Sequence, residues 1–358
     1  MTTPAETKQK RRYRLDRNVW NHCASTYEQR IVRGHPDVTA YESFEHSMLE
    51  KLVLFLTREC GSNLAVYDFG CGSGRIHQLL IPFLPAASGN GAWDAPGSGR
   101  VLQVGGVDFS EKMIAIALEN LKESGMGGLY PEYLSYDVGS AFDVQPYTGN
   151  AVPLAVSVCN SIGVMQGPEG AAQLFRTMGN HVRERRGIAL ISCYRREAVA
   201  GYALGNYEST MDVCGKPVWL QPADYGDGSY TLVPKYYKRA CDESPEITVD
   251  VMDGQGNCIE RDVVLTRDAI AVREVIKTGE IRTGTDYQSH WYSDGQVQQW
   301  MREYWNGATL WHIPGSRLDR LRGEPAQLAI ADFSGAFAPL AGRWGLAPLP
   351  ENGEKETA

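Results

Sequence analysis

Apolar residues recur at helical spacing along the N-terminal part of the chain, from Asn18 to about Arg58. Such spacing places them on one face and predicts two or three helices. The sequence Gly34-His35-Pro36 interrupts the pattern, because glycine and proline both disfavour a continuous helix. We therefore expect helices on both sides of this break, with their apolar faces turned towards a core.

Between Leu64 and Ser192 the pattern changes to short apolar segments separated by longer amphipathic ones. The segments that predict strands are Leu64–Phe69, Val101–Val107, Leu129–Tyr136, Leu154–Val158 and Gly187–Ser192. Helices are expected after Gly74, Ser110 and Pro168. Strands that alternate with helices in this way predict a parallel sheet with right-handed crossovers.

Two further stretches depart from this alternation. Residues 86–99 contain four Gly and four Ala without an apolar period, which is typical of a surface insertion. After the last predicted strand of the alternating region, the pattern favours antiparallel strands with a hairpin turn at 254–256. These strands are expected at Tyr230–Tyr237, Glu246–Asp253 and Asn257–Arg267, and an aromatic-rich segment follows from Tyr287.

Composition narrows the class of protein. The 358 residues include 35 basic and 43 acidic side chains, and the formal charge of −8 disfavours broad phosphate binding. Six of the ten residues from Lys8 to Arg17 are nonetheless Lys or Arg. No apolar run reaches the roughly 18 residues that span a bilayer, and the N-terminus has no signal-peptide pattern. The eight cysteines form no CxxC pair and the histidines no zinc-ligand spacing, so we expect a cytoplasmic enzyme without a metal.

The strongest local motif follows the first predicted strand, where Asp68-Phe69 leads into Gly70-Cys71-Gly72-Ser73-Gly74. Glycines allow a tight turn and let a ligand approach the backbone, while the next helix offers free N–H groups. The acidic Asp68 suits a ligand that carries a cationic amine. Dinucleotide-binding turns have the spacing GxGxxG, but here Arg75 occupies the position of the third glycine.

The pattern Asp-x-Gly-x-Gly-x-Gly resembles motif I of the class I S-adenosylmethionine-dependent methyltransferases. This resemblance implies an α/β fold with a Rossmann-like, doubly wound and mostly parallel sheet, and S-adenosylmethionine as the cofactor. In such folds an acid at the end of the second strand binds the ribose. Asp108 lies 34 residues after Gly74, or 20 when the 14-residue insertion is removed.

The resemblance also implies residues around the adenine ring. Phe109 and Met113, after the second strand, would pack near the ring, and Ser110 would cap the helix that contains Met113. Asp137 and Val138, at the end of the third strand, would lie near the adenine amino group.

From about Tyr27 to Arg196 the chain resembles the glycine N-methyltransferase-like branch, on the basis of Asn160-Ser161 after the fourth strand and Tyr194-Arg195-Arg196 after the fifth. The first residue of the former motif is Cys159 rather than glycine. The branch implies that Asn160 lies beside the transferred methyl group and that His290 is the best candidate base. The residues implied to line the acceptor pocket or to close over it are Tyr27, Arg30, Tyr194, Arg195, Arg196, Trp291 and Tyr292.

These inferences give an expected organisation of the chain. A mobile basic tail (1–17) precedes an N-terminal helical lid (18–62) and an S-adenosylmethionine-binding core (63–197). An antiparallel accessory region (198–288), a C-terminal completion of the core sheet (289–345) and a disordered tail (346–358) follow. The expected partner is a small molecule, with no membrane, and the expected state is a monomer or homodimer.

The predicted reaction is methylation of a small polar metabolite, an amine or an amino-acid-like compound, by in-line displacement that yields S-adenosylhomocysteine. Three alternatives remain open. An enzyme could consume S-adenosylmethionine alone, as in the cyclisation that forms azetidine-2-carboxylate and methylthioadenosine. The basic segment Lys8–Arg17 would suit an RNA methyltransferase, although the net charge disfavours nucleic acid. A hydrolase with Ser161 as nucleophile would need the GxSxG motif, whose first glycine is replaced by Cys159.

Overall fold

The structure of the protein is a computed structural model. Its described residues are 20, 21, 24, 36–85, 99–165, 167–195, 219–222, 230–237, 247–253, 258–265, 269–276, 285–314 and 326–350. Side chains are described within these ranges except at 36–43 and 219–291. The predictions for residues 1–17, for most of the 86–99 insertion and for the turn at 254–256 lie outside the described residues.

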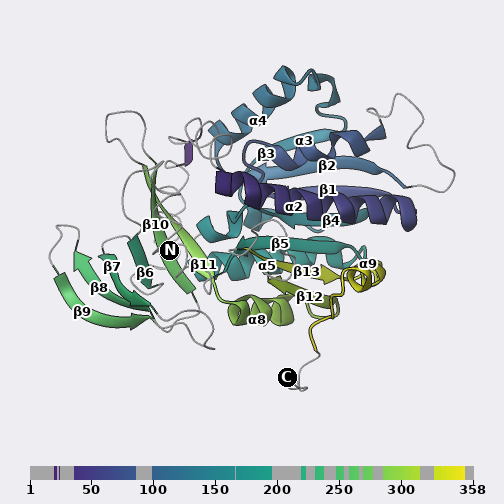
Figure 1. Ribbon diagram of the computed structural model, residues 1–358. Coiled ribbons are helices and arrows are strands. Elements are labelled where there is room, and N and C mark those ends of the chain that lie inside the picture. The colour runs from purple at the N-terminus through teal and green to yellow at the C-terminus, as the bar shows by residue number, and fades with distance from the viewer. Residues whose placement is uncertain are drawn as a thin grey trace, which may run out of the picture.

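Seven strands form the central sheet. They are β1 (Leu64–Phe69), β2 (Val101–Asp108), β3 (Leu134–Val138), β4 (Val152–Ser157), β5 (Ile188–Tyr194), β12 (Thr309–Pro314) and β13 (Ala326–Asp332). Their order is β12-β13-β5-β4-β1-β2-β3, and β1 to β5 pair in parallel (Figure 1). Strand β13 runs antiparallel to both β5 and β12. The doubly wound, mostly parallel sheet that the sequence predicted is therefore confirmed.

The third strand begins later than the sequence pattern indicated. A strand was expected over 129–136, but β3 covers Leu134–Val138 and a 3-10 turn, Gly127–Leu129, precedes it. Pro131 lies in the intervening segment and has no N–H group to donate to a neighbouring strand, which explains the late start. The other four predicted strands of this region are found within two residues of their expected ends.

Helices cover both faces of the sheet. They are α2 (Pro36–Leu54) with a π-helical end (Phe55–Glu59), α3 (Arg75–Leu80), α4 (Glu111–Glu123), α5 (Gly167–Arg183), α8 (Asp294–Tyr304) and α9 (Ala338–Arg343). Further 3-10 turns cover Ile81–Phe83, Ala141–Asp143 and Ser161–Val164. None of the described helices is both long and apolar enough to cross a membrane.

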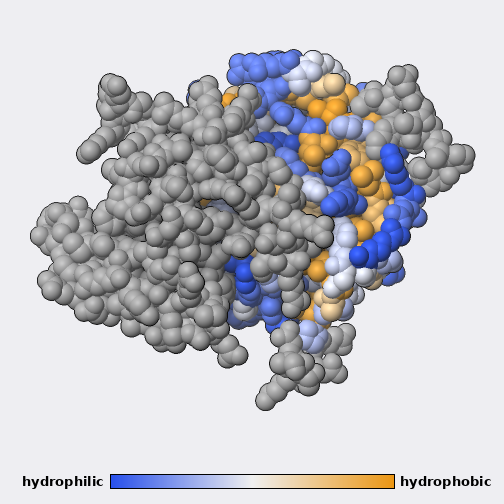
Figure 2. Space-filling model, in the orientation of Figure 1, coloured by the Kyte–Doolittle hydropathy of each residue, from blue (hydrophilic) through white to orange (hydrophobic). Residues whose placement is uncertain are grey.

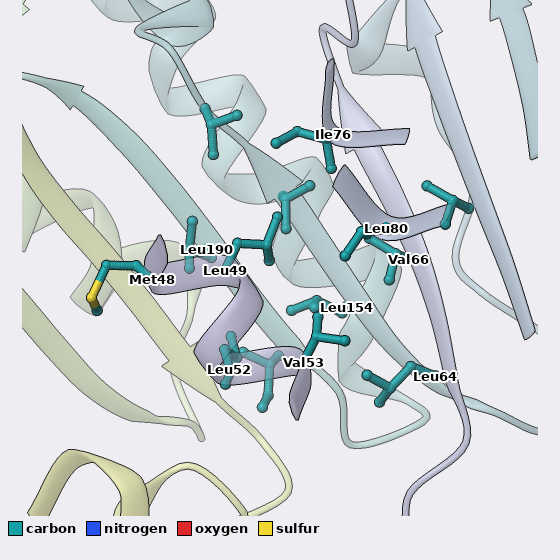
Figure 3. Packing of buried hydrophobic residues seen from close by; sticks show 14 of the residues in the cluster. Met48, Leu49, Leu52, Val53, Leu64, Val66, Ile76, Leu80, Leu154 and Leu190 are labelled. Carbon is teal, nitrogen blue, oxygen red and sulfur yellow. The ribbon is translucent and has the colours of Figure 1, made fainter. Parts of the chain in front are cut away.

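The core has two parts because alternate strand residues point to opposite faces. On one face Val66 of β1 packs with α2, α3, α4 and α9, and on the other Phe69 packs with α5 and α8. Figure 3 shows Leu49 of α2 beside Leu154 of β4 and Leu190 of β5. Over the described elements drawn in Figure 2, hydrophilic and hydrophobic surface residues interleave.

Between β5 and α8 the chain forms six further strands in two three-stranded antiparallel sheets. They are β6 (Trp219–Pro222), β7 (Tyr230–Tyr237), β8 (Ile247–Asp253), β9 (Cys258–Leu265), β10 (Ala269–Ile276) and β11 (Thr285–Tyr292). The sequence pattern had indicated only β7, β8 and β9 as strands. The chain leaves the core after Arg195 and returns at Tyr292, and these two residues form an isolated bridge (Figure 1).

Candidate functional site

The glycine turn after β1 leaves space above its middle residue. Gly70, Gly72 and Gly74 all have positive φ, between 51° and 86°, which side-chain-bearing residues rarely adopt. A Cβ on Gly70 would lie 2.8 Å from Met165 Cε, and one on Gly74 would lie 2.8 Å from the Tyr136 hydroxyl. A Cβ on Gly72 would meet no atom of the described residues within 4 Å. Packing thus requires the outer glycines, whereas Gly72 faces open space that a ligand can enter.

Asp108 connects this turn to the end of β2. Its Oδ2 accepts a hydrogen bond from Gly72 N–H at 3.0 Å and its Oδ1 one from Ser110 N–H at 2.8 Å. Burial raises the pKa of Asp108 to about 6, although both backbone donors favour the charged form. The ionised carboxylate therefore predominates at neutral pH and lies beside the open space at Gly72.

Asp68, the penultimate residue of β1, lies in a different environment. The residue is 2% exposed, and its Oδ1 has no hydrogen-bond partner among the described residues. Burial raises its pKa to about 8, with the charges of Asp108 and Glu45 adding to the rise and that of Arg75 opposing it. A buried carboxyl oxygen without a donor is costly, so this site favours a ligand that brings a donor or a positive charge.

The residues predicted around adenine lie at the adjoining strand ends. Met113 is buried at the start of α4 against Trp20 and Ala24, and Phe109 packs against the same cluster. Ser110 caps α4 by accepting from Met113 N–H, as the sequence suggested. The segment that contains Trp20 is held there by Asn21, whose Oδ1 accepts from the Ser110 hydroxyl at 2.8 Å.

The residues at the end of β3 are more exposed than Asp68 and Asp108. Val138 is 50% exposed, and Asp137 is exposed and accepts a hydrogen bond from the Tyr67 hydroxyl at 3.3 Å. An apolar side chain next to an accessible carboxylate is suited to the flat face and the amino group of a purine.

Asn160 lies in a strained turn after β4. Both Cys159 and Asn160 have φ near 55°, and Asn160 Oδ1 accepts from Tyr194 N–H at 3.1 Å. A Cβ on Gly163 would lie 2.4 Å from Asn160 Nδ2, so glycine is needed there to accommodate the buried amide. The Asn160 side chain thus joins the ends of β4 and β5.

Glu45 of α2 is a site residue that the sequence reasoning missed. It is 3% exposed, and its Oε1 accepts from Cys159 N–H at 2.8 Å. Glu45 precedes Leu49 by one helical turn on the buried face of α2, and a charged residue in that apolar row was the available signal. Glu45, Asp68 and Asp108 are called the carboxylate cluster below.

Two of the residues predicted near the acceptor, Arg195 and Tyr292, are bonded to other residues of the chain. Arg195 makes a bidentate pair with Asp294, at 2.8 Å from Nε and 2.6 Å from Nη2. Gln327 is fully buried, accepts from His312 Nε2–H at 2.8 Å and donates to the Tyr292 carbonyl at 2.7 Å. Arg195, Asp294, His312 and Gln327 are called the clasp below, because they fasten the two ends of the inserted region to the core.

The remaining predicted acceptor residues have the following positions. Tyr194 is half-buried at the end of β5, and Tyr292 is fully buried against Trp300 with ring centroids 4.9 Å apart. His290 and Trp291 lie on β11, but their side chains are outside the described set. Tyr27, Arg30 and Arg196 lie outside the described residues altogether. Within the described part of the chain, no group of three or more His, Cys, Asp or Glu is arranged to hold a metal ion.

Comparison with known proteins relates this fold to methyltransferases. No protein-family model and no curated protein sequence matches the chain. The structure of the CcbJ methyltransferase from Streptomyces caelestis matches with a TM-score of 0.50 and 12% identity, over 88% of this chain and 98% of that one. An S-adenosylmethionine-dependent methyltransferase from Clostridium acetobutylicum matches with a TM-score of 0.46 and 13% identity, over 88% and 99% of the two chains.

A further match is CalS10, an amino pentose methyltransferase from Micromonospora echinaspora with S-adenosylmethionine bound. Its TM-score is 0.38 and its identity 11%, over 80% of this chain and 89% of that one. Relatives this distant in sequence show the fold and no more. Together with the strand order, the match to the CcbJ methyltransferase shows that the chain has the Rossmann-like fold of the class I methyltransferases.

Proposed function

We propose that the protein is an S-adenosylmethionine-dependent methyltransferase whose acceptor is a small polar metabolite, an amine or an amino-acid-like compound. The observation that carries the proposal is the pair Asp68 and Asp108 around the open space at Gly72. One oxygen of Asp68 has no donor among the described residues, and Asp108 accepts from the glycine turn. Both lie at the edge of the sheet where ligands of α/β folds bind.

The residues present fit this cofactor. Asp108, at the end of β2, would accept from ribose hydroxyls, and Asp137 and Val138, at the end of β3, would contact the adenine edge. The buried Asp68 would accept a hydrogen bond from the ammonium group at the amino-acid end of the cofactor. The cofactor supplies a methyl group bonded to a positively charged sulfur. Transfer of this methyl group leaves S-adenosylhomocysteine, in which the sulfur is neutral.

The protein's own contribution to such a transfer is orientation and exclusion of water. Asn160 and Tyr194 meet where β4 and β5 end, so their backbone and side-chain oxygens can orient an acceptor amine. The backbone bond from Tyr194 N–H to Asn160 Oδ1 fixes this part of the site. His290 on β11 remains the side-chain candidate for proton removal.

The test is incubation of the full-length protein with S-adenosylmethionine, with and without a pool of amine and amino-acid metabolites, followed by mass spectrometry. We expect S-adenosylhomocysteine to accumulate only when the pool is present and not with Asp108→Ala. Methylthioadenosine formed without any acceptor would instead indicate that S-adenosylmethionine is the sole substrate. Absence of both products and of any binding would reject the proposal.

A further inference from the structure

Tyr67 of β1 reaches across a neighbouring strand to the end of β3. Tyr67 is paired in register with Gly105 of β2, and Gly105 is paired with Ser135 of β3. The Tyr67 hydroxyl nevertheless donates to Oδ2 of Asp137, two residues beyond Ser135, at 3.3 Å. Residues two apart in a strand share a face of the sheet, so the tyrosine side chain runs diagonally over β2 to its acceptor.

Gly105 makes this crossing possible. A Cβ on Gly105 would lie 2.8 Å from Cδ2 and 2.9 Å from Cε2 of Tyr67, and 3.1 Å from the Ser135 hydroxyl oxygen. Cβ atoms essentially never approach other atoms more closely than 3.0 Å, so any residue other than glycine would displace the tyrosine ring. Glycine weakens a strand interior, and its presence there often marks the close approach of another group. Here it keeps a path over β2 open for one aromatic ring.

The ring of Tyr67 is held by two aromatic neighbours. Its centroid lies 5.4 Å from that of Phe69 and 5.3 Å from that of His181. Burial raises the pKa of Tyr67, and the charge of Asp137 and the hydrogen bond to it add to the rise. The phenol therefore keeps its proton at neutral pH and acts as the donor in the bond to Asp137.

The bond from Tyr67 restrains a carboxylate that is otherwise exposed. Asp137 is exposed, and Val138 beside it is 50% exposed. An exposed side chain loses rotamer freedom when it binds a ligand, and this loss weakens binding. A carboxylate already bonded through one oxygen loses less freedom and still has a second oxygen that can accept a hydrogen bond. The bond to Tyr67 thus prepares Asp137 for a ligand that brings a donor.

We propose that Tyr67 is a positioning residue for the adenine end of the ligand, and that its hydroxyl orients Asp137 to accept from the 6-amino group of the purine. The inference rests on the proposed function, since that function supplies the adenine. It assigns selectivity for a 6-aminopurine to a residue of β1 that acts through the end of β3. A site built around such a hydrogen bond discriminates against an analogue that lacks the donor.

The experiment compares two ligands that differ only at position 6 of the purine. They are S-adenosylhomocysteine and its analogue with hydrogen in place of the 6-amino group. Dissociation constants for both are measured by calorimetry on the full-length protein, on Tyr67→Phe and on the control Tyr133→Phe. Phenylalanine keeps the ring between its aromatic neighbours and removes only the hydroxyl. Tyr133 is a matched control because its hydroxyl is also bonded to a carboxylate, that of Glu132, but it precedes the other end of β3.

We expect the unmodified protein to bind the analogue at least about 10-fold more weakly than S-adenosylhomocysteine, the usual loss for one hydrogen bond to a charged group. Tyr67→Phe should reduce this ratio at least about threefold by weakening S-adenosylhomocysteine, while the analogue changes by less than about twofold. Tyr133→Phe should leave the ratio as it is. A ratio that Tyr67→Phe leaves unchanged, whether affinity falls for both ligands or for neither, would reduce Tyr67 to a structural role and overturn the inference.

A double-mutant cycle tests whether Tyr67 acts through Asp137. In the background of Asp137→Asn, the further change Tyr67→Phe should alter the affinity for S-adenosylhomocysteine by less than about twofold. Losses that simply add would contradict the inference. Equal binding of both ligands by the unmodified protein would also overturn it, while the proposed function would stand. If the unmodified protein bound neither ligand, the proposed function would fall as well.

Discussion

The two halves of the candidate site differ in how their polar groups are satisfied. In the half formed by β1, β2 and α2, the carboxylate cluster is buried, and one oxygen of Asp68 has no donor among the described residues. In the half formed by β5, β11 and α8, the clasp has its charges paired and its buried amide bonded on both sides.

This difference in hydrogen bonding indicates which half of the candidate site gains most from binding a ligand. An unsatisfied buried carboxyl oxygen destabilises the ligand-free protein, and binding of a suitable cation removes this destabilisation. A satisfied clasp gains nothing more from a ligand and instead holds the inserted region in place. We therefore expect substitutions in the first half to change affinity, and substitutions in the second to change stability.

The largest expected effect is that of Asp108→Ala. This change removes the acceptor for Gly72 and Ser110 N–H as well as the group expected to bind the ribose, so affinity for S-adenosylhomocysteine should fall by at least about 100-fold. Methylthioadenosine should be weakened similarly, because it has the same ribose. Calorimetric titration checks both ligands, and Asp143→Ala, at an exposed carboxylate, is the matched control. A loss of less than about threefold would show that Asp108 is not part of the binding site.

An intermediate effect is expected from pH. The pKa of Asp68 is raised to about 8, so at pH 6.5 most molecules carry it protonated. Because a cationic ligand favours the ionised form, binding of S-adenosylhomocysteine should release a proton. Its affinity should rise as the pH rises from about 6.5 to 7.5, by up to about tenfold per pH unit.

This pH dependence has two controls, a substitution of Asp68 and a ligand without the amino-acid end. Asp68→Asn should flatten the profile, and methylthioadenosine should show little slope with either protein. The charges near this carboxyl are Arg75, which lowers its pKa, and Asp108 and Glu45, which raise it, so their own titration must be compared in the same series. A slope that persists unchanged in Asp68→Asn would assign it to one of those neighbours.

The smallest effect on binding is expected from the clasp. Asp294→Asn breaks a bidentate pair whose side chains are 16% and 24% exposed, and should lower the free energy of unfolding by about 1–2 kcal/mol. Affinity for S-adenosylhomocysteine should change by less than about twofold. Thermal or denaturant unfolding measures the first quantity and calorimetry the second.

A second ion pair provides the matched control for that measurement. Arg343 and Glu59 make a similar bidentate contact, but their side chains are 56% and 47% exposed. Glu59→Gln should therefore lower the free energy of unfolding much less than Asp294→Asn does, because solvent screens an exposed pair. Equal costs for the two substitutions would show that burial does not distinguish the clasp.

The sequence predicted the parts of the fold that depend on local pattern. Neighbouring residues encode the strand that contains Asp68, the strand that leads into Asp108, the glycine turn between strand and helix, and the cap at Ser110. The late start of β3 and the strands β6, β10 and β11 were missed. Of these strands only β6, with four residues, is too short to carry a clear periodic signal.

The site was harder to predict where it depends on long-range contacts. Arg195 meets Asp294 across 99 positions of the chain, and Glu45 meets Cys159 across 114. Neither pairing has a local signature, so Arg195 was expected only to line the acceptor pocket, and its pair with Asp294 was not foreseen. Glu45 could have been noticed only as a charged residue in an apolar row.

The isolated bridge between Arg195 and Tyr292 has a consequence for how such a protein can change. The points at which the chain leaves the core and returns to it are adjacent, so everything in between is a loop in the topological sense. Lengthening, replacing or removing that loop leaves the order and pairing of all seven core strands intact. Exchange of the inserted region is therefore compatible with an unchanged seven-stranded core.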